Sequence, residues 1–514
     1  MSYGAEIEKP IINPDGSPGR IESDDFLALQ KLTAVYNPEL HFSDIHNGIV
    51  TGVDSGLGSQ GLDNGNLVQE SALGPVKTLQ NLEELIRQDL NLMHGVLGDR
   101  TIVDLARYPG ANGTVDWEIY RRNVAPKGIY PVLWARGWDH TAGFEGQTQN
   151  SPSTGIEVGD AAMGVSVMFA ADAAISAIFG NSPRFDSNGK LVVNTSRTEM
   201  WDKMFGNSVA PGDRKMSVFP DKPFLTLADY FQWMWGKGTG MFFVLGEGDK
   251  DGYKGIGSSA VFIDDNPSVL DFLSRDEQNG YYPADNIPAG FPWATMPDNS
   301  IQGKGKARVT TIKPTVEGVQ HLQFMNFGPA RWRFALNAGI DPKEFTEICN
   351  TGGDLESLLK PHLTNSYIEG RTPCANFPSK RHAEVDDGVR NSLVISPSAL
   401  QAGLLTNPGQ NFHRIISRYS WTEITSLRET AIARGMEDPE VQRFSRFVFN
   451  IAFERLSSRL GQDEAQRLLR YPEHVIDTGM NGSSRAAEYV TNKLRKQRLG
   501  DAFISLLNDR ALLI

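Results

Sequence analysis

The spacing of hydrophobic residues predicts strands and loops over residues 1–75 and mainly helices over residues 395–514. Between these regions, leucine, isoleucine and methionine recur at helical spacing and predict a helix over residues 78–97. Residues 161–179 are almost entirely apolar and predict a buried core helix, which the following Gly-Asn-Ser-Pro sequence ends.

The remaining elements alternate without the regular strand–helix–strand repeat of a parallel sheet. Further helices are predicted over residues 225–235, 268–275, 421–434, 441–460, 484–496 and 502–507. Further strands are predicted over residues 67–70, 132–136, 154–158, 242–245, 308–312 and 367–369. The fold class we expect is therefore α+β, an antiparallel sheet with helices packed outside it and a C-terminal helical portion.

Composition describes an ordinary soluble globular chain, because 40% of the residues are hydrophobic and 22% are charged. At 514 residues, the chain is longer than one typical domain. Its net charge of −12 argues against a large nucleic-acid-binding surface. Anionic substrates would have to be held by local arginines or by metals.

The location in the cell is predicted to be the cytoplasm. The two cysteines, Cys349 and Cys374, cannot form a disulfide framework, which fits a reducing compartment. No basic region followed by an apolar core opens the chain, so no secretory signal is predicted. The apolar stretch 161–179 contains Asp172 and two serines, so it suits a core helix better than a membrane span.

Several common catalytic motifs are missing from the sequence. It contains no Walker-type phosphate loop, no dinucleotide-binding fingerprint, no zinc-protease motif and no nucleophile elbow. Its nine histidines do not cluster at zinc spacing. Carboxylates and arginines remain the best candidates for chemistry.

Six carboxylates lie in or beside short apolar segments. In a strand, Glu6 and Glu8 would share one face, where like charges repel unless a cation sits between them. The alternative is an exposed edge strand with two solvated glutamates. Strands that converge would instead form an acidic cavity suited to Mg²⁺ or Mn²⁺. The candidate ligands are Glu6, Glu8, Asp63, Glu70, Glu157 and Glu369.

Two arginines stand in similar settings, Arg197 before Trp201 and Arg371 two residues after Glu369. Arginine is the preferred bidentate partner of phosphate and carboxylate groups. The alternative for each arginine is a surface ion pair. Acids and arginines in one cavity indicate phosphoryl transfer from a metal-bound nucleotide.

The order of these motifs resembles the glutamate–cysteine ligase family of the plant and proteobacterial type, within the glutamine-synthetase-like superfamily of carboxylate–amine ligases. Residues 4–8 look like that family's opening G-x-E-x-E strand, and Asp63 to Glu70 looks like its second strand. The similar segments further along are 178–183, Ser196-Arg197 with Trp201, Tyr367-Ile368-Glu369-Gly370-Arg371, and 396–405.

The resemblance implies a sheet folded into a saddle or half-barrel, with residues 1–410 as the catalytic domain and 411–514 as a helical region packed on it. It implies ATP-dependent amide formation, with Mg²⁺ or Mn²⁺ ions held by the acids. Glu157 falls where the family has a neutral ligand. Arg197, Arg371 and Trp201 are the implied nucleotide- or substrate-binding residues, and both arginines are the implied catalytic ones. Glutamate is the implied acid, and the amine is cysteine or another amine.

The chain departs from the family at two places, and one of them is Arg371-Thr372-Pro373-Cys374, which replaces the family's R-G-A-D ending. The family's H-L-x-x-x-F-P-x-V-R stretch leads directly into Y-I-E-V-R, whereas here the segment from His321 to Arg331 lies about forty residues upstream of Tyr367. A second match, His362-Leu363, precedes Tyr367 closely, so either the chain has an insertion or one of the two matches is due to chance. Two other functions stay open: a phosphotransferase on the same fold, and a binding protein without catalysis.

Overall fold

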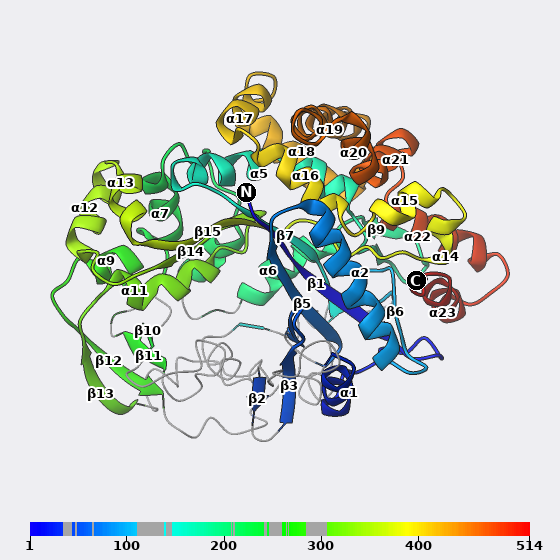
Figure 1. Cartoon of the computed structure of the whole chain (residues 1–514), viewed down its shortest axis with the longest axis horizontal. Coiled ribbons are helices and arrows are strands. Elements are labelled where there is room, and N and C mark those ends of the chain that lie inside the picture. Colours follow the sequence, from blue (N-terminus) through cyan, green and yellow to red (C-terminus); the bar gives the residue numbers. More distant parts are fainter. Residues whose placement is uncertain are drawn as a thin grey trace.

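The computed structural model describes residues 1–33, 44–46, 49–63, 66–109, 138–139, 146–206, 208, 211–240, 244–245, 260–263, 265, 267–283 and 306–513. Their main feature is a curled antiparallel sheet of nine strands that forms a half-barrel (Figure 1). The strands, in spatial order, are β14 (Ala330–Leu336), β15 (Leu363–Gly370), β7 (Asn150–Gly155), β1 (Tyr3–Ile12), β5 (Val68–Val76), β4 (Gly58–Leu62), β3 (Ile49–Asp54) and β2 (Asp44–His46), and β6 (Thr101–Ile102) pairs with β1.

Two smaller sheets accompany it. One contains β10 (Val244–Leu245), β11 (Ala260–Ile263), β12 (Gln278–Pro283) and β13 (Lys306–Ile312), and the other is the hairpin of β8 (Arg184–Phe185) and β9 (Leu191–Val193).

The N-terminal and middle helices are α1 (Ser23–Thr33), α2 (Leu79–Val96), α5 (Val158–Ile178), α6 (Glu199–Phe205), α7 (Leu227–Trp235), α9 (Val269–Leu273), α11 (Val316–Val319), α12 (Pro342–Thr351) and α13 (Leu355–Leu359). The later helices are α14 (Lys380–Ala383), α15 (Asp387–Ser392), α16 (Ser396–Leu405), α17 (Pro408–Ile416), α18 (Trp421–Arg434), α19 (Pro439–Leu460), α20 (Gln462–Leu468), α21 (Arg470–Thr478), α22 (Gly482–Leu494) and α23 (Leu499–Asp509).

The predicted fold class is confirmed. The helices expected over 78–97, 161–179, 225–235, 421–434 and 441–460 are present as α2, α5, α7, α18 and α19, and the C-terminal region is helical. The strand expected over 154–158 is wrong in its bounds, because β7 ends at Gly155 and α5 begins at Val158. Residues 132–136 and 242–243 lie outside the described residues.

Helix α5 is the central element of the core. It contacts α17, α18 and α19 on one side and β14 and β15 on the other. Gly164 permits the close approach to the sheet, since an added Cβ would lie 2.6 Å from Ile156 Cδ1 and 3.2 Å from Ile368 Cγ1. Among the described helices, α5 alone is long and apolar enough to cross a membrane by length and composition, and 94% of its most apolar window is buried.

The C-terminal helices are joined to the N-terminal part of the chain by backbone and side-chain contacts. The predicted division at residue 410 falls within α17. Beyond it, the Leu512 amide donates to the Ile102 carbonyl at 2.8 Å, and buried Arg510 pairs with buried Asp104 at 3.0 Å. These contacts fasten the chain end beside β6, next to the main sheet.

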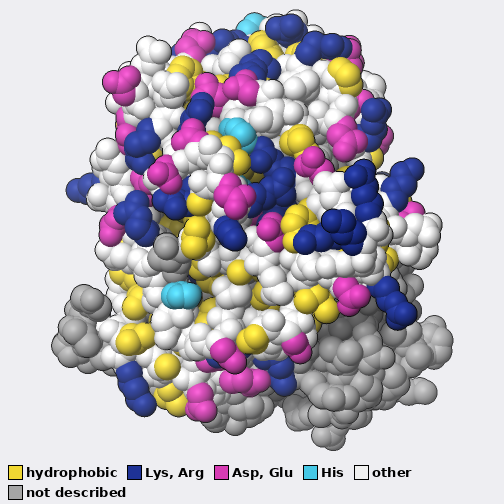
Figure 2. Space-filling view, turned by 90° about the vertical axis from the view of Figure 1, so that its right-hand side faces the viewer, with side chains coloured by type: hydrophobic (Ala, Val, Ile, Leu, Met, Phe, Trp, Pro, Cys, Tyr) yellow, Lys and Arg dark blue, Asp and Glu magenta, His cyan; other side chains and the backbone are white. Residues whose placement is uncertain are grey.

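Charge is unevenly distributed over the surface despite the net value of −12. Figure 2 shows one face of the molecule, the side on which α22 and α23 lie in Figure 1. Lys and Arg side chains gather near the middle of this face, with Asp and Glu side chains around them.

A buried polar network fixes α2 against the sheet. Lys9 is fully buried, and its Nζ lies 2.7 Å from Asp89 Oδ2 of α2. The same Nζ donates to Gln69 Oε1 and Ser71 Oγ of β5, each at 2.7 Å. The ammonium group of Lys9 therefore joins strands β1 and β5 and helix α2.

Replacing Asp89 by Asn leaves Lys9 buried without a countercharge, so we expect the free energy of unfolding to fall by about 3–5 kcal/mol. Denaturant unfolding measures this change, with Glu84→Gln, an exposed position on the same helix, as the control. Equal stability of Asp89→Asn and the unchanged protein would contradict the role given to this ion pair.

Acid should destabilise the protein through His382. Burial, together with Arg510, Arg485 and Arg381, holds the pKa of this histidine well below its ordinary 6.5. The unfolded chain takes up a proton near pH 6.5 that the folded protein does not, so the free energy of unfolding should fall as the pH drops below 6.5.

Thermal unfolding between about pH 7.5 and 5 measures this effect, and the Tm of His382→Gln should depend less steeply on pH than the Tm of the unchanged protein. The exposed His94→Gln is the control, and parallel curves for all three proteins would refute the assignment.

Candidate functional site

The strand register places a row of charged side chains on one face of the main sheet. Directly paired residues of antiparallel strands point to the same face. Such pairs follow one another across the sheet from β14 to β5: Arg331 with Glu369, Glu369 with Ser153, Ser151 with Glu6, and Glu8 with Glu70. We call this the charged face. Lys9 and Ile368 point the other way, toward α2 and α5.

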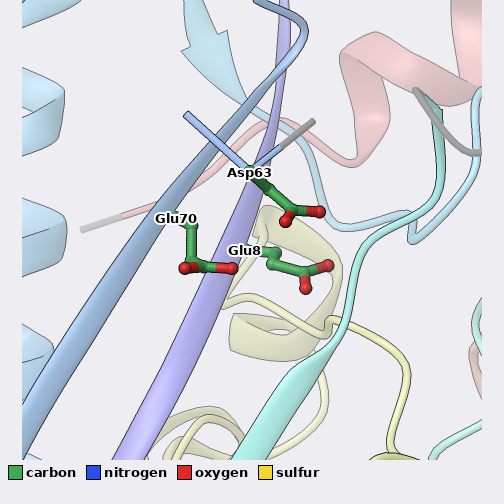
Figure 3. Close-up of side chains that lie close together, drawn as sticks. All are labelled: Glu8, Asp63 and Glu70. Atoms are coloured by element: carbon green, nitrogen blue, oxygen red, sulfur yellow. The ribbon is translucent and has the colours of Figure 1, made fainter. Parts of the chain in front are cut away.

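Three carboxylates of the charged face form an acidic cluster, which we define as Glu8, Asp63 and Glu70 (Figure 3). One oxygen from each lies within 4.8 Å of the others. Glu8 and Glu70 are direct partners across β1 and β5, and Asp63 follows β4 at the turn into β5. This geometry suits one hard cation bound by carboxylate oxygens.

The acidic cluster is electrostatically crowded. Burial, with Asp63 and Glu70 nearby, raises the pKa of Glu8 well above its ordinary value. Burial, Glu369 and Glu70 raise the pKa of Glu6 to about 7. A bound cation would favour the charged form of each acid, because opposite charge offsets both desolvation and mutual repulsion.

The solvated-edge alternative for Glu6 and Glu8 is therefore wrong. Strand β1 lies inside the sheet between β5 and β7, and only 4% of Glu8 is exposed. The backbone amide of Gln149 also donates to Glu8 Oε2 at 2.8 Å, and this contact orients the carboxylate.

Glu369 lies farther along the charged face, surrounded by an arginine cluster, which we define as Arg331, Arg333 and Arg371. Arg331 donates Nε to Oε2 at 2.8 Å and places Nη2 2.8 Å from Oε1. Arg371 donates Nη1 to Oε1 at 2.6 Å, and Arg333 Nε lies 3.6 Å from Oε2. Although burial opposes it, these guanidinium groups hold the pKa of Glu369 below its ordinary value.

Arg197 and Arg371 form an arginine pair between the two groups of acids. Arg197 Nη1 donates to the Arg371 carbonyl at 2.8 Å, and Nη2 donates to Gln149 Oε1. Both arginines are more than nine-tenths buried, so the alternative of surface ion pairs is wrong. Within the described part of the chain, the Nε atoms of both have no hydrogen-bond partner. A buried donor normally has a hydrogen-bond partner, so these two Nε atoms are candidate contact points for an anionic acceptor.

Trp201 lies in a buried aromatic group and contacts the site through Arg197. Its ring centroid is 4.6 Å from that of Phe327 and 5.9 Å from Cζ of Arg197. Phe327 in turn lies 5.6 Å from Cζ of Arg371. Trp201, which the sequence predicts to bind nucleotide, therefore packs against Arg197 of the arginine pair.

Glu157 is placed apart from the acidic cluster. The strand predicted to carry it ends two residues earlier, and Glu157 is the exposed N-cap of α5. Ser153, which pairs with Glu369, lies four residues before Glu157 in the sequence. Four residues of extended chain span roughly 13 Å. The local pattern predicted a strand, whereas the chain turns here to start α5.

Sequence reasoning did not assign Arg331, Arg333 or Gln149 to the site. The sequence Ala330 to Phe334 alternates apolar and arginine residues, which is the strand pattern that could have predicted β14. The unexplained forty-residue gap contains α12 and α13, and these helices connect β14 to β15. Strand β14, which carries Arg331, and strand β15, which carries Tyr367, are thus paired although they are far apart in the sequence.

No family model matches this chain, and no curated protein matches it. The resemblance to the glutamate–cysteine ligase family stays a prediction.

Metal binding should stabilise the protein through the acidic cluster. A ligand at 100 times its Kd adds about 2.7 kcal/mol to the free energy of unfolding. We expect millimolar Mn²⁺ to raise the Tm of the unchanged protein and of Glu157→Gln, and to leave that of Glu70→Gln almost unchanged. Differential scanning fluorimetry in buffer treated with a chelator measures the shifts. Equal shifts for the two variants would contradict the site.

Proposed function

We propose that this protein is an ATP-dependent carboxylate–amine ligase that forms an amide bond through an acyl phosphate. The observation that carries the proposal is the meeting, on one sheet face, of the acidic cluster and the buried arginine pair, joined by Gln149. Metal-binding acids beside free guanidinium donors are what phosphoryl transfer to a carboxylate needs.

The residues present fit a divalent ion. Glu8, Asp63 and Glu70 would hold Mg²⁺ or Mn²⁺, with Glu6 beside them, because crowded buried carboxylates are stabilised by a hard cation. Such ions, when bound, screen the negative charge of the ATP phosphates from these acids.

The arginine pair supports the transfer step. In that step, a carboxylate oxygen attacks the γ-phosphorus of ATP, the bond to the β–γ bridging oxygen breaks, and ADP leaves. Arg197 and Arg371 would bind the anionic groups and stabilise charge on the transferring phosphoryl group. An amine then attacks the acyl carbon, a proton leaves the nitrogen, and phosphate departs.

The substrates are proposed from the resemblance and not from the site geometry. The acid is glutamate, joined through its γ-carboxylate, and the acceptor is cysteine or another amine. The partners are therefore small molecules, and the location that goes with them is the cytoplasm. Nucleic acid and membrane play no part in this reaction.

The direct test is ADP release from Mg²⁺-ATP and glutamate with a panel of amines. We expect ADP and phosphate to form only when an amine is present. Glu8→Ala should lower the rate at least 100-fold, because it removes one acid of the acidic cluster, and Glu157→Gln should keep the full rate.

Three results would contradict the ligase proposal. ADP formed without phosphate release, together with a phosphorylated acceptor, would favour the phosphotransferase. Absence of both ADP and metal-dependent ATP binding would favour a binding protein without catalysis. Full activity of Glu8→Ala would remove the acidic cluster from the mechanism.

A further inference from the structure

Glu369 is already fully engaged by cations of the chain. Its Oε2 accepts from Arg331 Nε, and its Oε1 lies 2.8 Å from Arg331 Nη2 and accepts from Arg371 Nη1. Only 1% of this residue is exposed. A divalent ion on either oxygen would stand beside buried guanidinium groups, and like charges in such a setting repel strongly. Glu369 therefore fits the role of a metal ligand poorly, in contrast to Glu8 and Glu70.

The contacts of Glu369 instead lead to the arginine pair. Glu369 holds Nη1 of Arg371, and the Arg371 carbonyl accepts from Arg197 Nη1. The Nη2 atom of Arg197 donates to Gln149 Oε1, and the backbone amide of Gln149 donates to Glu8. Both terminal nitrogen atoms of Arg197 and Nη1 of Arg371 are thus fixed, and among the described residues neither Nε has a hydrogen-bond partner. Fixed guanidinium groups with free donors bind an anion with little loss of side-chain entropy.

Arg331 is suited to hold Glu369 in place. It comes from the neighbouring strand β14, directly opposite Glu369, and contacts both carboxylate oxygens through two different nitrogen atoms. Its Nη1 donates to the Phe324 carbonyl at 3.3 Å. Arg333 is more exposed, and its Nε lies 3.6 Å from Oε2. A two-point contact fixes a carboxylate more firmly than a single long one.

We propose that Glu369 is a positioning residue for the anion-binding arginine pair, that Arg331 holds it there, and that Glu8, Asp63 and Glu70 alone form the metal site. The nature of the anion, a substrate carboxylate or a phosphate, rests on the proposed function. The division of roles between the two groups of acids rests on the contacts above.

Two binding measurements on the full chain separate these roles. Calorimetry with inorganic phosphate and with succinate, in EDTA, reports on the arginine pair, and the two probes distinguish phosphate from carboxylate recognition. Calorimetry with Mn²⁺ alone reports on the acidic cluster. The variants are Glu369→Gln and Arg331→Lys, with Glu70→Gln as the metal-site control and Arg414→Lys, an arginine paired with Glu454 outside the site, as the matched control.

We expect Glu369→Gln and Arg331→Lys to weaken binding of at least one anion about tenfold or more and to keep the Mn²⁺ Kd within about threefold. Lysine keeps the charge of Arg331 but loses the two-point contact. Arg414→Lys should bind the anions normally, and Glu70→Gln should lose Mn²⁺. The double variant Glu369→Gln/Arg331→Lys should be no weaker than the worse single variant, because both act through one contact.

Loss of Mn²⁺ binding in Glu369→Gln, to the level of Glu70→Gln, would overturn the proposal. So would unchanged anion binding in Glu369→Gln, or failure of the unchanged protein to bind either anion. Thermal unfolding of each variant detects a general loss of structure, which would weaken both kinds of ligand together and so contradict the separate roles. A protein that shows the expected binding pattern but releases no ADP would refute the ligase and leave the positioning role standing.

Discussion

The rest of the site depends on the repulsion between carboxylates that the pairing of β1 with β5 brings face to face. Glu8 and Glu70 lie opposite each other, Asp63 closes the group, and Glu6 lies on the same face between this group and Glu369. Buried acids at this spacing need positive charge. At the Glu369 end, arginines of the chain supply it. At the other end, three acids share one small space, and a bound cation is the simplest way to satisfy them.

The opposite face of the same strands explains why this arrangement holds. A shift of one residue in the register would turn every side chain of β1 to the other face. Lys9 resists such a shift, because its ammonium group is shared by Asp89 of α2 and two residues of β5. Farther along this same face, Gly164 lets α5 pack against Ile368, directly before Glu369. Tight packing on one face thus keeps the charged groups of the other face in position.

Local patterns predicted the parts of this structure that depend on local rules. The alternation around Ile7 placed Glu6 and Glu8 on one face, and the expectation of converging strands grouped Asp63 and Glu70 with them. Helical spacing found α2, and a continuous apolar stretch found α5. The long-range pairing of β14 with β15 was not predictable in the same way, because α12 and α13 separate the two strands. Arg331 was missed for that reason, and Glu157 was misplaced because a short strand pattern ran into a helix N-terminus.

The location of bound metal tests the central claim most directly. A crystal structure of the protein soaked with Mn²⁺, with anomalous scattering data, would show where the ion lies. We predict density among the oxygens of Glu8, Asp63 and Glu70, with Glu369 still bound to Arg331 and Arg371. Density on Glu369, or none among the three acids of the cluster, would contradict the account.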